Sequence, residues 1–272
     1  MNKKNRIFDC FTFFNEKKLL NIRFNILNKF VDYFVICESK FDHRGEKKLL
    51  NFNINDYNKF KEKIIYLVLD DFPKFETTWE RQDYQRDYLI NGLSNSKSED
   101  IILFSDVDEI PNLENNLELI FSNPDKIGIF NQEVFYYKLN LKVLDYNQWE
   151  GTRVLKKKNL KTFSWLRNKV RLKNLKYGFW RFDKYKNVYK IFNGGWHFSF
   201  LGNPEIISSK IRSYTHLEYD KDEFTDVEKI KKRILELKDP YDRGKKLTKV
   251  EINEDFPDYI KNNQENLKDI IS

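Results

Sequence analysis

Short apolar runs alternate along the first third of the chain with stretches in which apolar residues recur every three or four positions. Residues 6–14 are short, aromatic and β-rich, a pattern typical of a strand. Asn15 then caps an expected helix whose apolar residues recur at near-helical spacing from Leu19 to Phe30. Residues 31–37 predict a second buried strand that ends at Glu38.

The same alternation continues through the next seventy residues. Residues 64–69 predict a third strand, residues 79–93 a helix closed by Gly92, and residues 101–104 a fourth strand. Strands that alternate with helices predict an α/β fold with a mixed, mostly parallel central sheet and helices on both faces. Ligands of such sheets bind outside the carboxyl ends of the strands.

The pattern loosens after Pro111. Residues 133–144 read as a strand or hairpin arm, and a helical pattern dominates from Asp222 before a polar tail. With no internal repeat and no Gly/Ser or Pro linker, we expect one domain over residues 1–222. Residues 223–272 are expected to form a helical appendage packed on that domain.

Composition narrows the class of protein. Hydrophobic residues make up 40% of the 272 residues and aromatic residues 16%, which excludes disorder. The 49 Lys and Arg are interleaved with 42 Asp and Glu, so no nucleic-acid partner is expected, only weak peripheral attraction to an anionic membrane. Without an apolar run of membrane-spanning length, and with Cys10 and Cys37 in strand-like runs, we expect a cytoplasmic protein with buried thiols. Nothing in the pattern indicates an oligomeric state.

Two carboxylates, Asp106 and Asp108, follow directly on the fourth predicted strand. Side chains two apart on an extended segment point the same way, and both would lie at the strand's carboxyl end. They could hold Mg²⁺ or Mn²⁺ by oxygen ligands. The alternative is a pair of loop or helix-capping acids.

Other candidates are basic or imidazole side chains. His197 follows two glycines in an aromatic run and could complete a metal shell with Asp108, whereas His43 is expected to be structural and His216 is a weaker candidate. Arg86, in the predicted helix, suits diphosphate oxygens, with ordinary intrahelical ion pairing as the alternative.

Four of these segments, residues 7–16, 31–38, 105–111 and 195–199, occur in an order and spacing that resemble glycosyltransferase family 17. The resemblance covers residues 6–220. It implies a Rossmann-like GT-A fold and an inverting transfer from a UDP-sugar donor, most simply UDP-GlcNAc, to a glycan acceptor, with Mn²⁺ or Mg²⁺ as cofactor.

Site roles follow from this resemblance. Asp108 would bind the metal, Asp106 would support the metal or the ribose, and His197 would be the third ligand. Arg81 and Arg86 would lie at the diphosphate.

The remaining expected roles concern the nucleotide, the base and the sugar. Glu38 would accept hydrogen bonds from uridine or ribose, and Glu109 or Glu133 would be the catalytic base. Trp196 would stack on a sugar face or pack in the core.

Two other classes of function are weighed against this one. An apolar strand before Asp-x-Asp also resembles haloacid-dehalogenase phosphohydrolases, but Glu109-Ile110-Pro111 and the late position of the strand depart from that pattern. A non-catalytic nucleotide-sugar or glycan-binding protein is the second. Eukaryotic family members carry a membrane anchor and luminal cysteines that this sequence lacks, so their N-glycan acceptor is not carried over.

Overall fold

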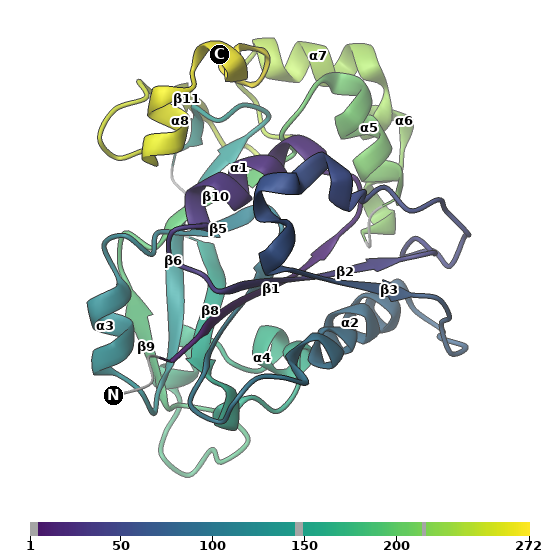
Figure 1. Cartoon of the computed structure of the whole chain (residues 1–272). Helices are drawn as coiled ribbons and strands as arrows, with labels where there is room; N and C mark the ends of the chain where they lie inside the picture. Colours follow the sequence, from purple (N-terminus) through teal and green to yellow (C-terminus); the bar gives the residue numbers. More distant parts are fainter. Residues whose placement is uncertain (1–4, 145–148, 214–215) are drawn as a thin grey trace.

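The computed structural model describes residues 5–144, 149–213 and 216–272. They form a mixed α/β protein in which helices pack against one large sheet (Figure 1). The strands are β1 (Ile7–Phe13), β2 (Tyr33–Ser39), β3 (Ile64–Leu69), β4 (Ile101–Asp106), β5 (Glu109–Pro111), β6 (Ile127–Tyr136), β7 (Leu141–Val143), β8 (Trp149–Lys156), β9 (Val188–Ile191), β10 (Gly195–Ser199) and β11 (Leu247–Lys249). The helices are α1 (Lys17–Leu27), α2 (Thr78–Tyr88), α3 (Leu117–Ser122), α4 (Phe163–Asn168), α5 (Pro204–Ser213), α6 (Asp222–Thr225), α7 (Val227–Leu235) and α8 (Asp258–Asn262).

The four apolar runs of the N-terminal half form the parallel part of the sheet, in the order β3-β2-β1-β4. Each predicted strand is confirmed to within two residues at either end. Because the strands are parallel, their carboxyl ends at Phe13, Ser39 and Asp106 meet at one edge of the sheet. The first helix begins at Lys17, so Glu16 and not Asn15 is its N-cap.

Helices cover both faces of this parallel part, as predicted. Phe34 and Ile36 of β2 pack in the cluster that contains α1, and Val35 and Cys37 pack in the cluster on the other face. Figure 1 shows α1 and α2 on opposite sides of these strands. The predicted helix over residues 79–93 is α-helical only to Tyr88 and continues as a 3-10 turn.

The second half of the sheet contains antiparallel pairs. β8 joins β4 to β6 with antiparallel pairing on both sides, and β10 runs parallel to β6 and antiparallel to β5. In that last pair His197 lies opposite Glu109, which brings residues from distant parts of the sequence beside the end of β4. Residues 133–144 form an antiparallel hairpin from the end of β6 to β7, which confirms the predicted hairpin arm.

Part of the C-terminal segment, which the sequence analysis describes as a polar tail, is buried in the structure. The predicted helix is present as α7, but Phe256, Ile260, Leu267 and Ile270 of the tail belong to the main core cluster. β11 adds a strand beside β7. Four residues of the polar tail are therefore part of the core, and the domain boundary at residue 222 stays a prediction.

Cys10 and Cys37 are buried free thiols, as expected, and burial raises the pKa of Cys37 to about 12. Of the helices formed by residues 5–144, 149–213 and 216–272, none is both long and apolar enough to cross a bilayer.

Candidate active site

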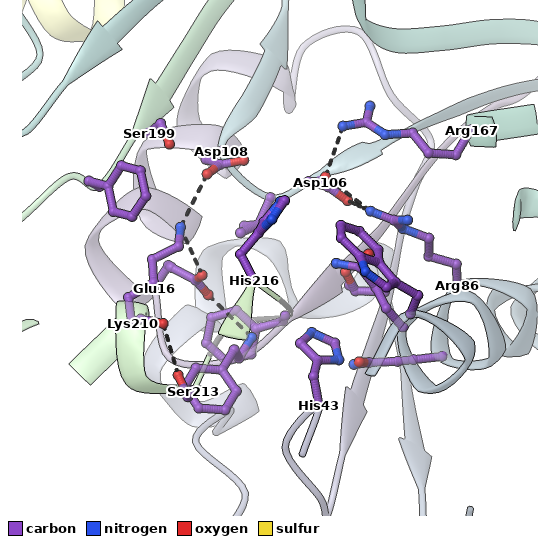
Figure 2. Close-up of a pocket in the computed structure, with 18 of the residues that line it drawn as sticks. Glu16, His43, Arg86, Asp106, Asp108, Arg167, Ser199, Lys210, Ser213 and His216 are labelled. Carbon is purple, nitrogen blue, oxygen red and sulfur yellow. Dashed lines mark hydrogen bonds and ion pairs between the residues drawn. The ribbon is translucent and has the colours of Figure 1, made fainter. Parts of the chain in front are cut away.

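A cavity of about 370 Å³ opens where β1 and β4 end, at the edge predicted for ligands. Thr12 and Phe13 of β1, Asp106 and Asp108 after β4, and His197 of β10 line its walls. α2, α4 and α5 contribute the basic side chains that face these acids (Figure 2).

A buried arginine stabilises the backbone of the turn that carries the two acids. Arg23 of α1 is fully buried and forms an ion pair with Asp9 at 2.6 Å. Its Nη1 donates to the carbonyl oxygens of Asp106 at 3.3 Å, Val107 at 3.3 Å and Glu109 at 2.8 Å. The conformation of the acidic turn therefore depends on a charge pair in the core.

Asp108 lies between an imidazole and an ammonium. His197 Nε2 is 3.6 Å from Asp108 Oδ1, and Lys210 Nζ is 3.2 Å from Asp108 Oδ2 and 3.5 Å from Glu16 Oε1 (Figure 2). Burial alone would raise the pKa of Asp108, but Lys210 and His197 outweigh it and hold that pKa well below its ordinary value. Asp108 is therefore a carboxylate at any physiological pH.

Asp106 has a different set of partners. Its carboxylate accepts hydrogen bonds from Arg86 Nη2 at 3.1 and 3.3 Å and from Arg167 Nη2 at 3.0 Å. Burial opposes ionisation here too, but the two guanidinium groups lower the pKa of Asp106 to about 2. The carboxylate thereby holds both arginines toward the cavity.

The predicted three-ligand metal shell is not assembled. Asp108 and His197 are brought together, whereas Asp106 is engaged by arginines. Within the part of the chain that the structure describes, no three His, Cys, Asp or Glu side chains are grouped as a metal ion would require.

Positive charge exceeds negative charge in the cavity wall. Six Lys or Arg side chains face four carboxylates, which suits a ligand that carries a diphosphate. The basic residues are Lys48, Arg86, Arg167, Arg171, Lys210 and Arg243, and the acidic residues are Glu16, Asp42, Asp106 and Asp108.

Both residues predicted as catalytic bases lie outside the cavity lining. The Glu109 carboxylate is fully buried, and it accepts hydrogen bonds from Arg167 at 2.7 and 3.0 Å and from Trp149 Nε1 at 2.5 Å. Glu133 forms an ion pair with Lys142 at 2.5 Å and lines a separate groove. Glu109 thus positions Arg167, and neither carboxylate faces the site where a substrate would react.

Trp196, Glu38 and Arg81 are also placed elsewhere. Trp196 faces the groove with Glu133, and its indole N–H donates to the carbonyl oxygen of Asp255. The buried Glu38 carboxylate accepts hydrogen bonds from Lys48 and from the backbone N–H groups of Asn51 and Phe52. These hydrogen bonds stabilise the fold.

Arg81 lies on the same helix as Arg86, but its side chain does not reach the acids of the cavity. Its guanidinium donates to the carbonyl oxygens of His43 and Phe75, and it does not line the cavity. Arg86, one and a half turns further along, does. The structure therefore separates the two arginines that the resemblance places together at the diphosphate.

Sequence reasoning missed Arg167 and Lys210. Each lies on a helix that the sequence analysis did not predict, α4 and α5 respectively. Two signals could have indicated α5: a proline, Pro204, at its first position, and two buried isoleucines four residues apart, Ile207 and Ile211.

His43, expected to be merely structural, lines the cavity. Burial and the charge of Arg86 lower its pKa to about 4 against the opposing effect of Asp42 and Asp106, and its Nδ1 has no hydrogen-bond partner within the described residues. The folded protein therefore favours the neutral imidazole.

Because the folded pKa of His43 lies below the unfolded value, its contribution to stability is complete above pH 6.5 and is lost as the pH falls toward 4. We expect the free energy of unfolding to fall by up to about 3 kcal/mol across this range. Denaturant titrations at several pH values should show that slope in the wild type and a flatter one in His43→Gln. Equal slopes would contradict the assignment.

Comparisons with known proteins place these residues in a family. The family model for glycosyltransferase family 17 matches residues 1–244. The β-1,4-mannosyl-glycoprotein 4-β-N-acetylglucosaminyltransferases of Rattus norvegicus and Homo sapiens are each 33% identical over 116 residues, which cover 39% of this chain. The matched part spans only 22% of the length of these relatives.

Solved structures resemble the chain only weakly. A crystal structure of 4-diphosphocytidyl-2C-methyl-D-erythritol synthase aligns with 14% identity and a TM-score of 0.36, over 57% of this chain and 77% of the other. Such a score assigns no fold. The family match, by contrast, extends over most of the sequence and includes the acidic turn and β10, and on that ground the chain belongs to glycosyltransferase family 17.

Proposed function

We propose that the protein transfers N-acetylglucosamine from UDP-GlcNAc to a hydroxyl group of a glycan. Membership of the family and the names of the matched relatives support the reaction and the donor. The observation that carries the proposal is the cavity in which Asp108 and His197 face Arg86 and Arg167. We also propose the GT-A arrangement, because the acids stand at the carboxyl end of β4 in a parallel β3-β2-β1-β4 unit.

A divalent cation fits two of the three predicted ligands. Asp108 Oδ1 and His197 Nε2 are 3.6 Å apart, a separation that two ligands of one ion can have. The carboxylate suits Mn²⁺ or Mg²⁺, and the imidazole favours Mn²⁺ over the harder Mg²⁺; both ions commonly complete their coordination with substrate phosphates and water. When bound, such an ion would neutralise charge on the UDP leaving group.

The chain's own cations act on the same diphosphate. Arg86 and Arg167 are held side by side by Asp106, so their guanidinium groups are oriented before a ligand arrives. Lys210 is positioned similarly between Asp108 and Glu16. Preorganised donors of this kind stabilise a developing negative charge without reorganisation.

Inversion at the anomeric carbon, which the resemblance implies, requires a base close to the acceptor hydroxyl. Such a base must line the cavity. Glu16 does, whereas Glu109 and Glu133 do not. We therefore move the candidate base from the two predicted residues to Glu16.

Arg86→Gln should weaken UDP binding by roughly 10- to 100-fold, since a charge-assisted hydrogen bond to the diphosphate is lost. Arg81→Gln is the matched control on the same helix and should leave affinity unchanged. Titration calorimetry with UDP and Mn²⁺ measures both. Equal weakening by the two variants would remove Arg86 from the donor site.

A donor screen tests the function itself. The protein is incubated with UDP-GlcNAc, UDP-glucose, UDP-galactose, GDP-mannose and a CMP-sugar, each with Mn²⁺, and release of the nucleotide is followed. We expect slow hydrolysis of UDP-GlcNAc that stops when the metal is chelated. Preference for a GDP- or CMP-sugar, or release of phosphate from simple phosphomonoesters, would overturn the proposal.

A further inference from the structure

An exposed aromatic and basic loop follows α4. Its base is a 3-10 helix over Leu172–Lys176, and it returns to the sheet at β9. In Figure 1 the chain between α4 and β9 forms the loop at the lower edge of the molecule. We call residues 172–187 the aromatic loop.

Three large apolar side chains of the aromatic loop are turned toward solvent. Phe179 is 82% exposed, Trp180 64% and Phe182 91%. Isolated exposed apolar residues are ordinary, but three within four positions form a patch that a soluble surface rarely keeps without a partner.

Side-chain contacts hold the base of the loop, although its tip is exposed. Asn174 Nδ2 donates to the carbonyl oxygens of Lys169 and Tyr185, and the rings of Trp165 and Tyr185 pack edge to face at 5.2 Å. Lys186 donates to the carbonyl oxygen of Gly178. These contacts close the loop at its base, so the tip aromatics project as a preformed group.

Positive charge accompanies the aromatics. The aromatic loop contains five Lys or Arg and one Asp, a net charge of +4 out of +7 for the whole chain. The basic residues are Lys173, Lys176, Arg181, Lys184 and Lys186. More than half of the excess charge thus lies within one short segment.

We propose that the aromatic loop binds the surface of an anionic lipid bilayer. Trp and Phe insert at the level of the headgroups, and Lys and Arg around them are attracted to anionic lipid. A second copy of the chain fits this patch poorly, because an isologous contact would place +4 against +4. The inference does not depend on the transferase activity.

The loop also begins at the cavity. Arg167 and Arg171, which line the cavity, lie within five residues of Leu172 in the sequence. A bilayer bound by the aromatic loop would therefore contact the protein next to the cavity wall that carries these arginines.

Sedimentation with vesicles tests the proposal. We expect the wild type to bind vesicles of phosphatidylcholine mixed with phosphatidylglycerol about tenfold more tightly than vesicles of phosphatidylcholine alone, and high salt to reduce the difference. The combined variant Phe179→Ser, Trp180→Ser and Phe182→Ser should lose about tenfold in binding to the anionic vesicles. Circular dichroism should show an unchanged fold, because these side chains are exposed.

Leu49→Ser combined with Leu235→Ser is the matched control, since both leucines are more than three-quarters exposed and lie outside the loop. This control should bind like the wild type. Equal binding by the aromatic variant and the wild type would overturn the proposal. So would a wild-type dimer in sedimentation velocity that the aromatic variant converts to a monomer, because the patch would then be an interface between copies.

Discussion

Asp108→Asn should reduce the rate of UDP release from UDP-GlcNAc by about 100- to 1000-fold or more while leaving the fold intact. Asparagine has the same shape but no charge, so it keeps the packing of the turn and removes the carboxylate that His197 and Lys210 surround. A coupled assay for UDP and a thermal unfolding curve measure the two effects.

Glu133→Gln is the informative control for that experiment. Glu133 is one of the two candidate bases that the sequence predicts, with Glu109, but its carboxylate pairs with Lys142 in a separate groove. We expect nearly wild-type activity. An active Asp108→Asn protein, or an inactive Glu133→Gln protein with an intact fold, would show that the cavity has been assigned to the wrong residues.

Arg23→Leu should lower the free energy of unfolding by about 3–5 kcal/mol. The substitution leaves the Asp9 carboxylate buried without its counter-ion and frees the carbonyl oxygens of the acidic turn. Denaturant unfolding of the single variant measures this loss.

The double variant Asp9→Leu with Arg23→Leu separates charge from packing. Removing both charges together relieves the uncompensated carboxylate, so the double variant should be more stable than Arg23→Leu alone. An Arg23→Leu protein whose free energy of unfolding lies within about 1 kcal/mol of the wild-type value would contradict the expected loss, because exposed ion pairs contribute no more than that.

The parallel part of the fold could be predicted because its signals are local. Residues 101–104 are buried and residues 64–69 at the end of the sheet are mostly half-buried, and both runs consist of apolar or aromatic residues. The position of Asp106 and Asp108 at a ligand-binding edge follows from the end of such a run. The sequence also offers His197 as a partner of Asp108, but no local signal predicts the pairing of β10 with β5 that brings the two together.

Alternation along a strand explains where the structure places Trp196. Neighbouring residues of a strand face opposite sides, so a strand that turns His197 into the cavity turns Trp196 away from it. Glu109 begins β5 directly after the turn that holds Asp108, and its carboxylate is buried against Arg167 and does not line the cavity. Adjacency in sequence is thus a poor guide to shared function in an extended segment.

Other residues could not be found because their roles depend on long-range packing. Lys210 has no motif around it and reaches Asp108 only through the packing of α5, whose Ile207 and Ile211 are buried with Phe200 in one apolar cluster. The tail residues Phe256, Ile260, Leu267 and Ile270 stand among many polar residues, yet they are buried in the main cluster.

A crystal structure with UDP-GlcNAc and Mn²⁺ tests the central claim most directly. We expect the diphosphate to contact Arg86 or Arg167, and the ion to be bound by Asp108 and His197 together with phosphate oxygens. A nucleotide bound away from this cavity, or an ion that contacts neither Asp108 nor His197, would contradict the account.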